Sequence, residues 1–388
     1  MQTVRKTFKY KLQPTPAQEW ELERMLMLCG TLYNTALEQR IAAWQGCRVS
    51  VSRFQQEAER KSIRAELPEY AAIHSHVLQD VLARLDKTSQ ACFRRVQAGQ
   101  TPGFPRCKGR ARFPSFTCKE DGNGARLENG VLVLSKIGRI AGRWSRPIAG
   151  TPKTVTFSKA ADGWYVAFSC AFSCADVACQ PVPLTGQETG IDLGLDSFAT
   201  LANGSQITNP RSFRVAEPNL KRAQRRVARR KKVSNRRKKA VVLLAKAHAK
   251  VRRARQDFHH KTALALGRQY DTIYHEDLQT ANMVQNHHLA KSIADAGWSA
   301  FLAILSFKAV EAGKTVVAVP PAFTLQACSG CGVLVQKGLS GRWHSCPACG
   351  ASLHRDHNAA RNILRLGQAS RAGQSVQAST WAVGPCVA

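Results

Sequence analysis

The sequence predicts a fold of two kinds, an α/β region and an antiparallel β region that carries a helical insertion. Three apolar runs that end at Asp192, Glu276 and Val319 alternate with helical segments, which is typical of an α/β sheet. Short β runs recur between residues 126 and 175 and are separated by Asn-Gly and Asp-Gly turns, which indicate hairpins. Apolar residues at helical spacing fill residues 15–97 and predict the helical insertion.

The first predicted strand covers residues 1–14. Phe8 and Tyr10 alternate with basic residues, so one face of this strand is expected to be buried and the other basic. Thr15 followed by Pro16 is a helix-start signal, with threonine as N-cap and proline at the first helical position. The helix is expected to run toward Trp44.

Two more helical blocks follow, over 52–66 and 70–97, and Phe93 is predicted to face inward from the second. The four β runs after them are expected at Val131–Leu134, Ile137–Trp144, Thr154–Ser158 and Trp164–Phe172. With the first strand they should form a small sheet or barrel, into which the helices are inserted.

In the α/β region, strands are expected on both sides of an Asn203-Gly204 turn, and helices over 217–232, 235–268 and 289–312. Thr315–Val319 is predicted as a buried strand, and a last helix is predicted from about 355 to 366. The residues after it are rich in Gly, Ala, Ser and Gln, which is typical of a disordered tail.

The charge of the chain indicates a polyanionic partner. Lys and Arg number 57 against 26 Asp and Glu, a formal net charge of +31. No run approaches the roughly 18 apolar residues of a spanning helix, and the first residues lack the apolar core of a signal peptide. Nucleic acid is therefore favoured over a membrane.

The odd total of 13 cysteines fits a reducing, cytoplasmic setting, where the protein would associate with the bacterial nucleoid.

Residues 221–255 contain seventeen Lys or Arg and no acid, on two predicted helices. A run of charge is often a solvated helix face, but like charges one turn apart destabilise a helix. A phosphate backbone along these helices would relieve the repulsion. The candidate contacts are Arg225, Arg229, Arg230, Lys231, Lys232, Arg236 and Arg237.

Residues 100–118 combine basic residues with Phe104, Phe113 and Phe116. This pattern suits a nucleic-acid backbone followed by cations while bases stack on rings. A basic surface loop anchored by a few aromatic residues explains it equally well. The candidate contacts here and on the first strand are Lys6, Lys9, Lys11, Arg106, Lys108, Arg110 and Arg112.

Two Cys-x-x-Cys pairs in one segment predict a tetrahedral zinc site. Its ligands are Cys328, Cys331, Cys346 and Cys349. A redox dithiol is the rival interpretation, and two pairs so close together make it the weaker one. Four protein ligands leave no open position, so this zinc would be structural.

The spacing of Cys170, Cys174 and Cys179 could also indicate a metal cluster, but the first two alternate with phenylalanines as in a packed strand.

Three acidic residues form the candidate catalytic site. Asp192 and Glu276 end predicted buried strands, and Asp356 opens the last helix. A single acid at a strand end is weak evidence, but three acids at one sheet edge repel one another and need cations. Hard carboxylate oxygens suit Mg²⁺ or Mn²⁺, and two such ions can flank a phosphodiester during hydrolysis.

The order of these motifs closely resembles the TnpB family, transposon-encoded RNA-guided nucleases related to type V CRISPR effectors. The resemblance rests on G-I-D-L-G-L-D-S-F-A-T-L, H-E-D-L, L-A-K-S-I-A-D-A-G-W and C-S-G-C…C-P-A-C-G…R-D-H-N-A-A-R-N-I, and it covers nearly the whole chain. Two positions depart from the family: His354 replaces an acid, and T-L-Q-A-C precedes the first zinc pair where T-S-Q-T-C is usual. Neither departure removes a ligand.

The resemblance implies an RNase H-like RuvC nuclease domain with an inserted zinc ribbon, preceded by a β-barrel wedge domain with an inserted helical recognition domain. The implied boundaries are wedge strand 1–14, recognition domain 15–118, wedge barrel 119–180, a first nuclease segment 186–322 with basic hairpin 217–268, zinc ribbon 323–350, a second nuclease segment 351–367 and tail 368–388.

The resemblance also implies an RNA-guided DNA endonuclease. A guide RNA from the transposon end would pair with double-stranded DNA, and the RuvC site would cut both strands by metal-assisted hydrolysis. Gln79 is a candidate reader of a short motif beside the target, and 279–288 a candidate lid. The alternatives are an RNA-guided repressor that does not cut, a transposase that joins strands, and a nonspecific nucleic-acid-binding protein.

Overall fold

The computed structural model describes residues 3–109, 112–119, 122–128, 130–173, 183–336, 338 and 341–373. The chain divides into two compact units, Met1–Val177 and Ala178–Ala388. Each has its own hydrophobic core, and each is described separately below.

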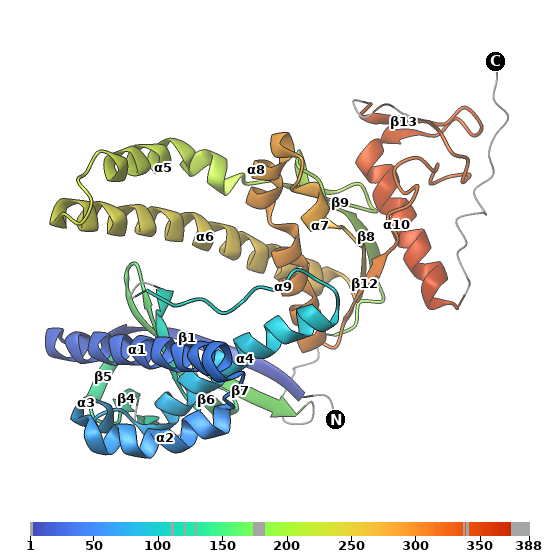
Figure 1. The fold of residues 1–388 in the computed structure, drawn as a ribbon. Coiled ribbons are helices and arrows are strands. Elements are labelled where there is room, and N and C mark those ends of the chain that lie inside the picture. The colour runs from blue at the N-terminus through green and yellow to red at the C-terminus, as the bar shows by residue number, and fades with distance from the viewer. Residues whose placement is uncertain are drawn as a thin grey trace. The chain divides into compact units, whose positions relative to one another are not determined.

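The first unit is built on a seven-stranded sheet in the order β2-β6-β7-β1-β5-β4-β3 (Figure 1). All its pairings are antiparallel, and β1 lies between β7 and β5, as expected for an N-terminal strand that joins a later meander. The predicted hairpin at Asp162-Gly163 is confirmed, because Ala160 pairs with Gly163. The strands are β1 (Thr3–Gln13), β2 (Ser115–Cys118), β3 (Ala125–Glu128), β4 (Val131–Leu134), β5 (Gly138–Arg143), β6 (Thr151–Ala160) and β7 (Gly163–Ser173).

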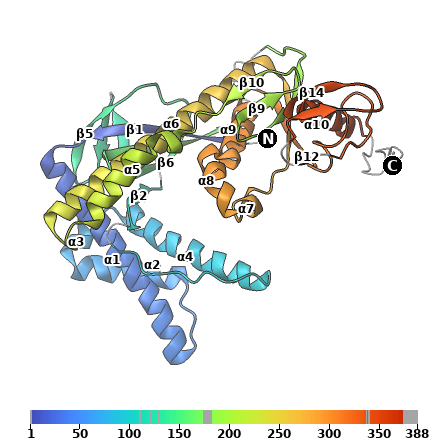
Figure 2. The same cartoon turned by 90° about the horizontal axis from the view of Figure 1, so that it is seen from above.

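Four helices are inserted between β1 and β2, which confirms the predicted helical insertion. The first begins as predicted, with Thr15 and Gln18 forming a reciprocal capping box. Figure 2 shows α2 and α4 near α1, and α4 packs on both α1 and α2. The prediction that Phe93 faces inward is wrong, since 60% of it is exposed. The helices are α1 (Pro16–Cys47), α2 (Arg53–Glu66), α3 (Pro68–Ala71) and α4 (Ser75–Gln97).

The second unit is built on a five-stranded sheet in the order β10-β9-β8-β11-β12. β11 runs parallel to both β8 and β12, whereas β8, β9 and β10 form an antiparallel meander through the predicted Asn203-Gly204 turn. The strands are β8 (Glu188–Asp192), β9 (Ser197–Leu201), β10 (Gln206–Thr208), β11 (Thr272–Glu276) and β12 (Thr315–Val319). β12 was predicted to be buried, but it lies at the sheet edge and only Val319 is buried.

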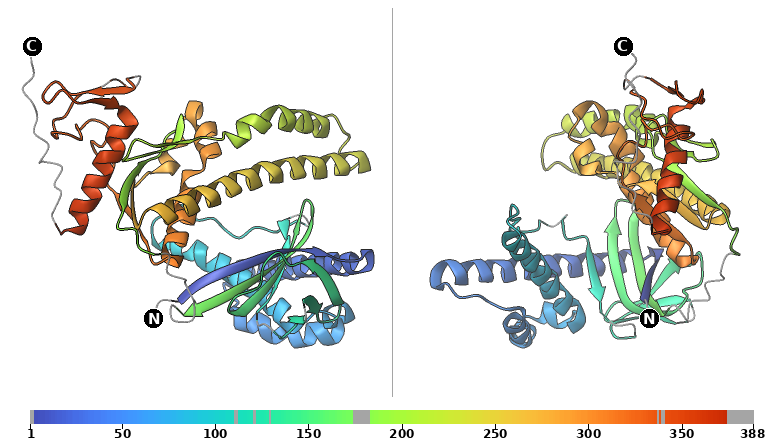
Figure 3. Two further views of the ribbon diagram at one scale, coloured as in Figure 1. Left: turned by 180° about the vertical axis from the view of Figure 1, so that it is seen from behind. Right: turned by 90° about the vertical axis from the view of Figure 1, so that its right-hand side faces the viewer.

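Helices cover both faces of this sheet. Ile273 packs with residues of α6, α8 and α9, whereas its neighbour Tyr274 packs with Ile363 of α10, as expected from strand alternation. Figure 3 shows α10 running along the sheet, with the cysteine-rich segment at its N-terminal end. The helices are α5 (Ser212–Ala228), α6 (Asn235–Gln269), α7 (Thr280–Met283), α8 (His287–Ala296), α9 (Trp298–Glu311) and α10 (Arg355–Arg371).

Three boundaries in this unit differ from the predictions. The helix expected over 289–312 is two helices, because Gly297 adopts a left-handed φ of 65° between α8 and α9. The candidate lid 279–288 contains α7 and the start of α8. The last helix extends to Arg371, whose guanidinium lies 2.7 Å from Glu188 Oε1, so 368–371 do not belong to a disordered tail. Residues 374–388 lie outside the described part of the chain.

Among the described residues, one segment, His287–Glu311, is long and apolar enough to cross a membrane by length and composition alone, contrary to the sequence-based expectation. Core helices of globular proteins pass the same test. Here Ile293, Trp298, Phe301 and Leu305 are buried in the core of the second unit. We therefore interpret this segment as core.

Helix α10 lies unusually close to the sheet at Gly190 of β8. A Cβ atom there would lie 2.2 Å from the Ala360 carbonyl oxygen and 2.6 Å from the Leu364 nitrogen. Since both atoms are backbone, the helix would have to move. We expect Gly190→Ala to lower the free energy of unfolding by about 3 kcal/mol, measured by urea denaturation. Gly267→Ala is the matched control, because nothing lies within 4 Å; it should stabilise α6 by about 1 kcal/mol. Equal effects of the two would contradict this packing.

Asp271 holds the starts of three strands together. Its backbone bonds to Gln187 and Thr315, and its carboxylate accepts from Gly186 N at 2.6 Å and lies 3.0 Å from the buried ammonium of Lys314. Burial alone would raise the pKa of Asp271, but hydrogen bonds from the backbone of Thr185, from Lys314 and from the backbone of Gly186 lower it to about 2.

A carboxyl whose pKa is lower in the folded state stabilises the fold above its ordinary pKa. We expect Asp271→Asn to lower the urea midpoint at pH 7, and the difference from the unsubstituted protein to shrink as pH falls from about 4 toward 2. The exposed pair Asp257–Lys261 provides the control, since Asp257→Asn should change the midpoint little. A difference that is independent of pH would contradict this role of the Asp271 charge.

Candidate active site

The fold brings the three predicted acids to one edge of the second sheet. Asp192 is the last residue of β8 and Glu276 the last of β11, and these strands are parallel neighbours in a register that pairs His275 with Ile191. Asp356 is the second residue of α10. A Cβ on Gly194, two residues after Asp192, would lie 4.0 Å from Asp356 Oδ2.

Asp192 and Asp356 are buried, Glu276 is half-buried, and the charges of Glu276 and Asp356 act on Asp192. Asp192 is 8% exposed, and its pKa is raised well above the usual range by burial, then by the charges of Glu276 and Asp356. Burial also raises the pKa of Glu276, although the Thr324 hydroxyl donates a hydrogen bond to Glu276 Oε1. Arg355 partly offsets the charge, with its Nε 3.4 Å from Asp356 Oδ1. A divalent cation would relieve the remaining repulsion, so this donor set fits Mg²⁺ or Mn²⁺.

The carboxylates are less compactly arranged than the cysteines. Within the part of the chain that the structure describes, the four cysteines are the only set of three or more acidic, histidine or cysteine ligand atoms that all lie within 4.8 Å of one another.

The four cysteines lie together as predicted. The Sγ atoms of Cys328 and Cys349 are 3.6 Å apart, and those of Cys331 and Cys346 are 3.5 Å apart. Sulfurs bound to one zinc ion at about 2.3 Å would be roughly 3.8 Å apart, so the cluster fits zinc. β13 (Trp343–Ser345) pairs with β14 (Ser352–His354) on either side of the second pair. This second half of the cluster therefore sits in a hairpin turn.

The four thiols differ in acidity: the pKa of Cys346 is lowered, whereas hydrogen bonds among the thiols raise the pKa of Cys349 to about 12. Burial opposes ionisation of Cys346, but hydrogen bonds from the backbone of Cys349 and Ala348 and from neighbouring thiols lower its pKa to about 7. A thiolate is the form that binds zinc. Of the alternative trio, Cys170 is buried within β7, which confirms the packing interpretation for that residue, while Cys174 and Cys179 lie outside the described residues.

Two asparagines of α10, which the sequence motifs did not single out, join the cysteine cluster to the acids. Asn358 and Asn362 are completely buried. Asn358 accepts from Ser329 N at 2.9 Å and donates to the Ala327 carbonyl at 2.7 Å. Asn362 donates to the carbonyls of Ala327 and Thr324. Their spacing of four residues places them on one face of the helix, and this spacing is the sequence signal that could have identified them.

His354, one of the two departures from the family pattern, has a structural role. Its Nδ1 accepts a hydrogen bond of 3.3 Å from Asp356 N and so caps the start of α10. The same ring packs edge-to-face on Trp343, a side chain that is 65% exposed. The cap therefore fixes the orientation of the helix turn that carries Asp356.

The basic candidate contacts of the second unit lie on the α5–α6 hairpin, whose two helices run side by side in Figure 1. Five arginines line a cavity of about 510 Å³ at the C-terminal end of α5 and just after it: Arg222, Arg225, Arg226, Arg229 and Arg230. Lys231, Lys232 and Arg236 are exposed at the hairpin tip. Arg237 differs from them, because it is half-buried and donates to the Val227 carbonyl at 2.8 Å. It therefore caps α5, a role that the charge pattern did not reveal.

The exposure of the aromatic residues in segment 100–118 agrees only partly with the prediction that they stack on bases. Phe113 and Phe116 are buried in the core, so the prediction that they stack on bases is wrong, whereas Phe104 is 61% exposed. Lys108 lies over the Tyr33 ring at 4.3 Å. Arg106 and Arg112 are exposed, and Arg110 lies outside the described residues.

The remaining candidates lie on β1 and α4. Lys9 is exposed and lies 4.6 Å from the Tyr165 ring centroid. Lys11 pairs with Asp162 at 3.5 Å, and Lys6 lies over the Phe8 ring. Gln79 is half-buried on α4.

Sequence comparison places this arrangement among transposon proteins. Residues 170–287 match the OrfB_IS605 family, described as "Probable transposase", residues 298–363 match "Cas12f1-like, TNB domain", and residues 1–47 match a helix-turn-helix domain. In the structure, the described part of the helix-turn-helix match 1–47 consists of β1 and the single long helix α1.

Similar proteins cover nearly the full chain. A protein of Streptomyces pristinaespiralis named "Putative RNA-guided DNA endonuclease" is 36% identical over 96% of this chain and 92% of its own length. "Putative RNA-guided DNA endonuclease InsQ" of Escherichia coli (strain K12) is 29% identical over 95% of this chain and 94% of its own length.

Among solved structures, the Cas12f1 chain of a Cas12f1–sgRNA–target DNA complex matches with a TM-score of 0.56 at 12% identity, covering 93% of this chain and 98% of that chain. This likeness confirms a mixed α/β fold of the compact-effector type. Together with the family matches and the 36% identical relative, it shows that the chain belongs to the TnpB family, the OrfB proteins of IS605-type elements.

Proposed function

We propose that this protein is an RNA-guided DNA endonuclease that hydrolyses phosphodiester bonds at the site of Asp192, Glu276 and Asp356. The observation that carries the proposal is the convergence of these three acids, two buried and one half-buried, from two parallel strands and a helix start, in a chain of net charge +31. Acids in so basic a protein would repel DNA unless they held cations. The names of the two similar proteins point to the same activity.

The three carboxylates would hold two Mg²⁺ or Mn²⁺ ions, which when bound activate water and stabilise the leaving oxygen. The chain itself positions the ligands. Thr324 orients Glu276 through its hydroxyl, and the His354 cap orients the helix turn of Asp356. Arg355, beside Asp356, would bind a phosphate oxygen of the DNA strand.

The four cysteines would hold one structural zinc ion. The buried asparagines Asn358 and Asn362 join this ribbon to the helix of Asp356, so a nucleic-acid strand bound by the ribbon would be held beside the acids. We assign the ribbon to 323–350 and the two nuclease segments to 186–322 and 351–367. In the first unit, the sheet would be the wedge domain and α1–α4 the recognition domain.

The guide would be an RNA from the transposon end, bound by the exposed arginines of α5 and the basic face of β1, and it would pair with double-stranded target DNA.

The test is to purify the protein from cells that carry its native locus and to sequence the RNA bound to it. We expect one defined species from the end of the element. Random RNA would contradict the proposal, and strand transfer without RNA would favour a transposase instead.

A further inference from the structure

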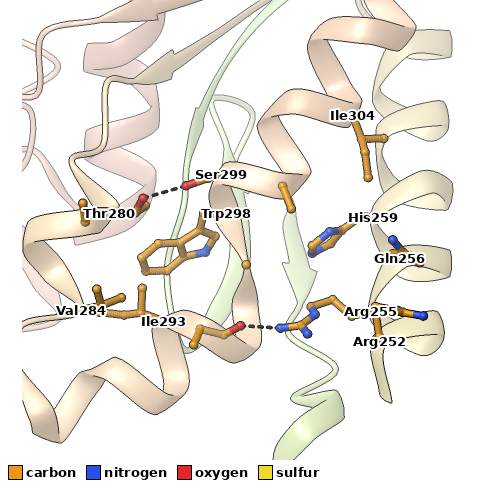
Figure 4. Close-up of a pocket in the computed structure, with 14 residues that line it drawn as sticks. Arg252, Arg255, Gln256, His259, Thr280, Val284, Ile293, Trp298, Ser299 and Ile304 are labelled. Carbon is orange, nitrogen blue, oxygen red and sulfur yellow. Dashed lines mark hydrogen bonds between the residues drawn. The ribbon is translucent and has the colours of Figure 1, made fainter. Parts of the chain in front are cut away.

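A second cavity in the second unit, of about 510 Å³, lies between α6, α7, α8 and α9. Its volume is in the range of pockets that bind small molecules. Figure 4 shows Trp298 on one side and Arg255, Gln256 and His259 of α6 on the other. Neither the acids nor the cysteines line it, so the proposed hydrolysis does not account for it.

The pocket is braced by hydrogen bonds across its walls. Thr280 Oγ1 and Ser299 Oγ are 2.7 Å apart and join α7 to α9, and Arg255 donates to the Ala294 carbonyl and joins α6 to α8 (Figure 4). His259 Nε2 lies 2.9 Å from the Ala296 carbonyl. The cavity is therefore formed before any ligand enters.

The chemistry of the walls suits a flat, polar ring joined to an anion. Val284, Ile293 and Ile304 supply apolar walls. Trp298 is 3% exposed, and its indole Nε1 is a buried donor for which the described residues provide no acceptor. Because this nitrogen has almost no accessible surface, a ligand in the cavity would contact the indole ring rather than Nε1. Gln256, exposed at the rim, offers both a donor and an acceptor.

The rim is cationic, and its position on α6 identifies the anion. Arg252 is exposed and lines the cavity, and Arg255 is the last residue of the basic run 221–255. A phosphate backbone that follows this run along α6 would reach the pocket rim at its end. An unstacked base would then lie against apolar walls while its phosphate meets Arg252.

We propose that this pocket binds one unstacked nucleotide of the nucleic acid that lies along α6, with its phosphate at Arg252 and its base against the Trp298 wall. This rests on the proposed nucleic-acid binding by α5 and α6, and not on cleavage. The ligand could come from the guide RNA or from a DNA strand, since both supply a base and a phosphate.

Filling the pocket tests the proposal. Ala300 of α9 lines the cavity and is exposed, so Ala300→Trp would occupy it without entering the core. Ala303 is exposed on the same helix and does not line the cavity, so Ala303→Trp is the matched control. The probes are a short oligothymidine and a short oligouridine, each with one central 2-aminopurine, titrated without Mg²⁺ or Mn²⁺ so that no strand is cut and the zinc is retained.

We expect Ala300→Trp to weaken binding by about tenfold and to abolish the fluorescence change of the bound 2-aminopurine, while Ala303→Trp matches the unsubstituted protein. Weaker binding of the DNA probe alone would assign the nucleotide to a DNA strand, and weaker binding of the RNA probe alone would assign it to the guide. Unchanged affinity and fluorescence for both probes would overturn the proposal.

A second pair of variants tests the proposal even if Ala300→Trp does not fold. Arg252→Gln removes the rim cation, and Lys250→Gln removes an exposed cation that does not line the pocket. The proposal requires a larger loss of the 2-aminopurine signal for Arg252→Gln than for Lys250→Gln, and equal effects would contradict it. Because the assay contains no Mg²⁺ or Mn²⁺, its result is independent of whether the protein cleaves DNA.

Discussion

Replacing Asp192 with alanine is expected to reduce DNA cleavage by about a thousandfold or more, while binding of RNA and DNA is retained. The buried carboxylate would hold the cations, and losing several kcal/mol of transition-state stabilisation has this effect on rate. The measurement is single-turnover cleavage of a matched DNA target, with binding followed in parallel by gel shift.

The control for this variant removes an acid without touching the site. Asp277 follows Glu276 directly, but its side chain is exposed. Asp277→Ala should therefore cleave at nearly the unsubstituted rate. If Asp192→Ala still cleaves, the assignment of the site is wrong. If the unsubstituted protein binds guide and target but never cuts, the protein is an RNA-guided repressor.

Replacing Cys328 with serine is expected to reduce the zinc content from about one ion per chain to nearly none, and to reduce cleavage with it. Cys328 is fully buried, and the backbone beside it is held by Asn358 and Asn362, so loss of zinc would displace the ribbon relative to Asp356. Zinc is measured by mass spectrometry on the purified protein, and cleavage on the same preparation.

Cys47→Ser is the matched control, since this cysteine is exposed in the other unit and should lose neither zinc nor activity. A zinc-free Cys328→Ser protein that cleaves at the full rate would show that the ribbon has no role in placing Asp356.

The acids and cysteines could be predicted from the sequence because their signals are local. Two Cys-x-x-Cys pairs define a metal site by spacing alone, and the structure places their sulfurs together. Acids at the ends of parallel strands must share a sheet edge, which is where Asp192 and Glu276 lie. Asp356 was a weaker prediction, because a helix start alone does not show which strand ends it will meet, and the family resemblance supported it.

What the sequence could not show depends on contacts between distant segments. The alternation of basic and aromatic residues in 100–118 does not reveal that Phe113 and Phe116 enter the core of the first unit. The charge of Arg237 does not reveal that it caps α5. Nor does the apolar run of β12 show that it is an edge strand, because burial depends on which strand lies beyond it.

The central claim is that RNA directs this protein to the DNA that it cuts, and retargeting tests it most directly. The guide segment of the bound RNA is replaced with a sequence that matches a new plasmid site, and the cut positions are mapped by sequencing in the presence of Mg²⁺. We expect the cuts to move to the new site and to disappear in Asp192→Ala. Cuts that stay in place, or that occur without RNA, would contradict the account.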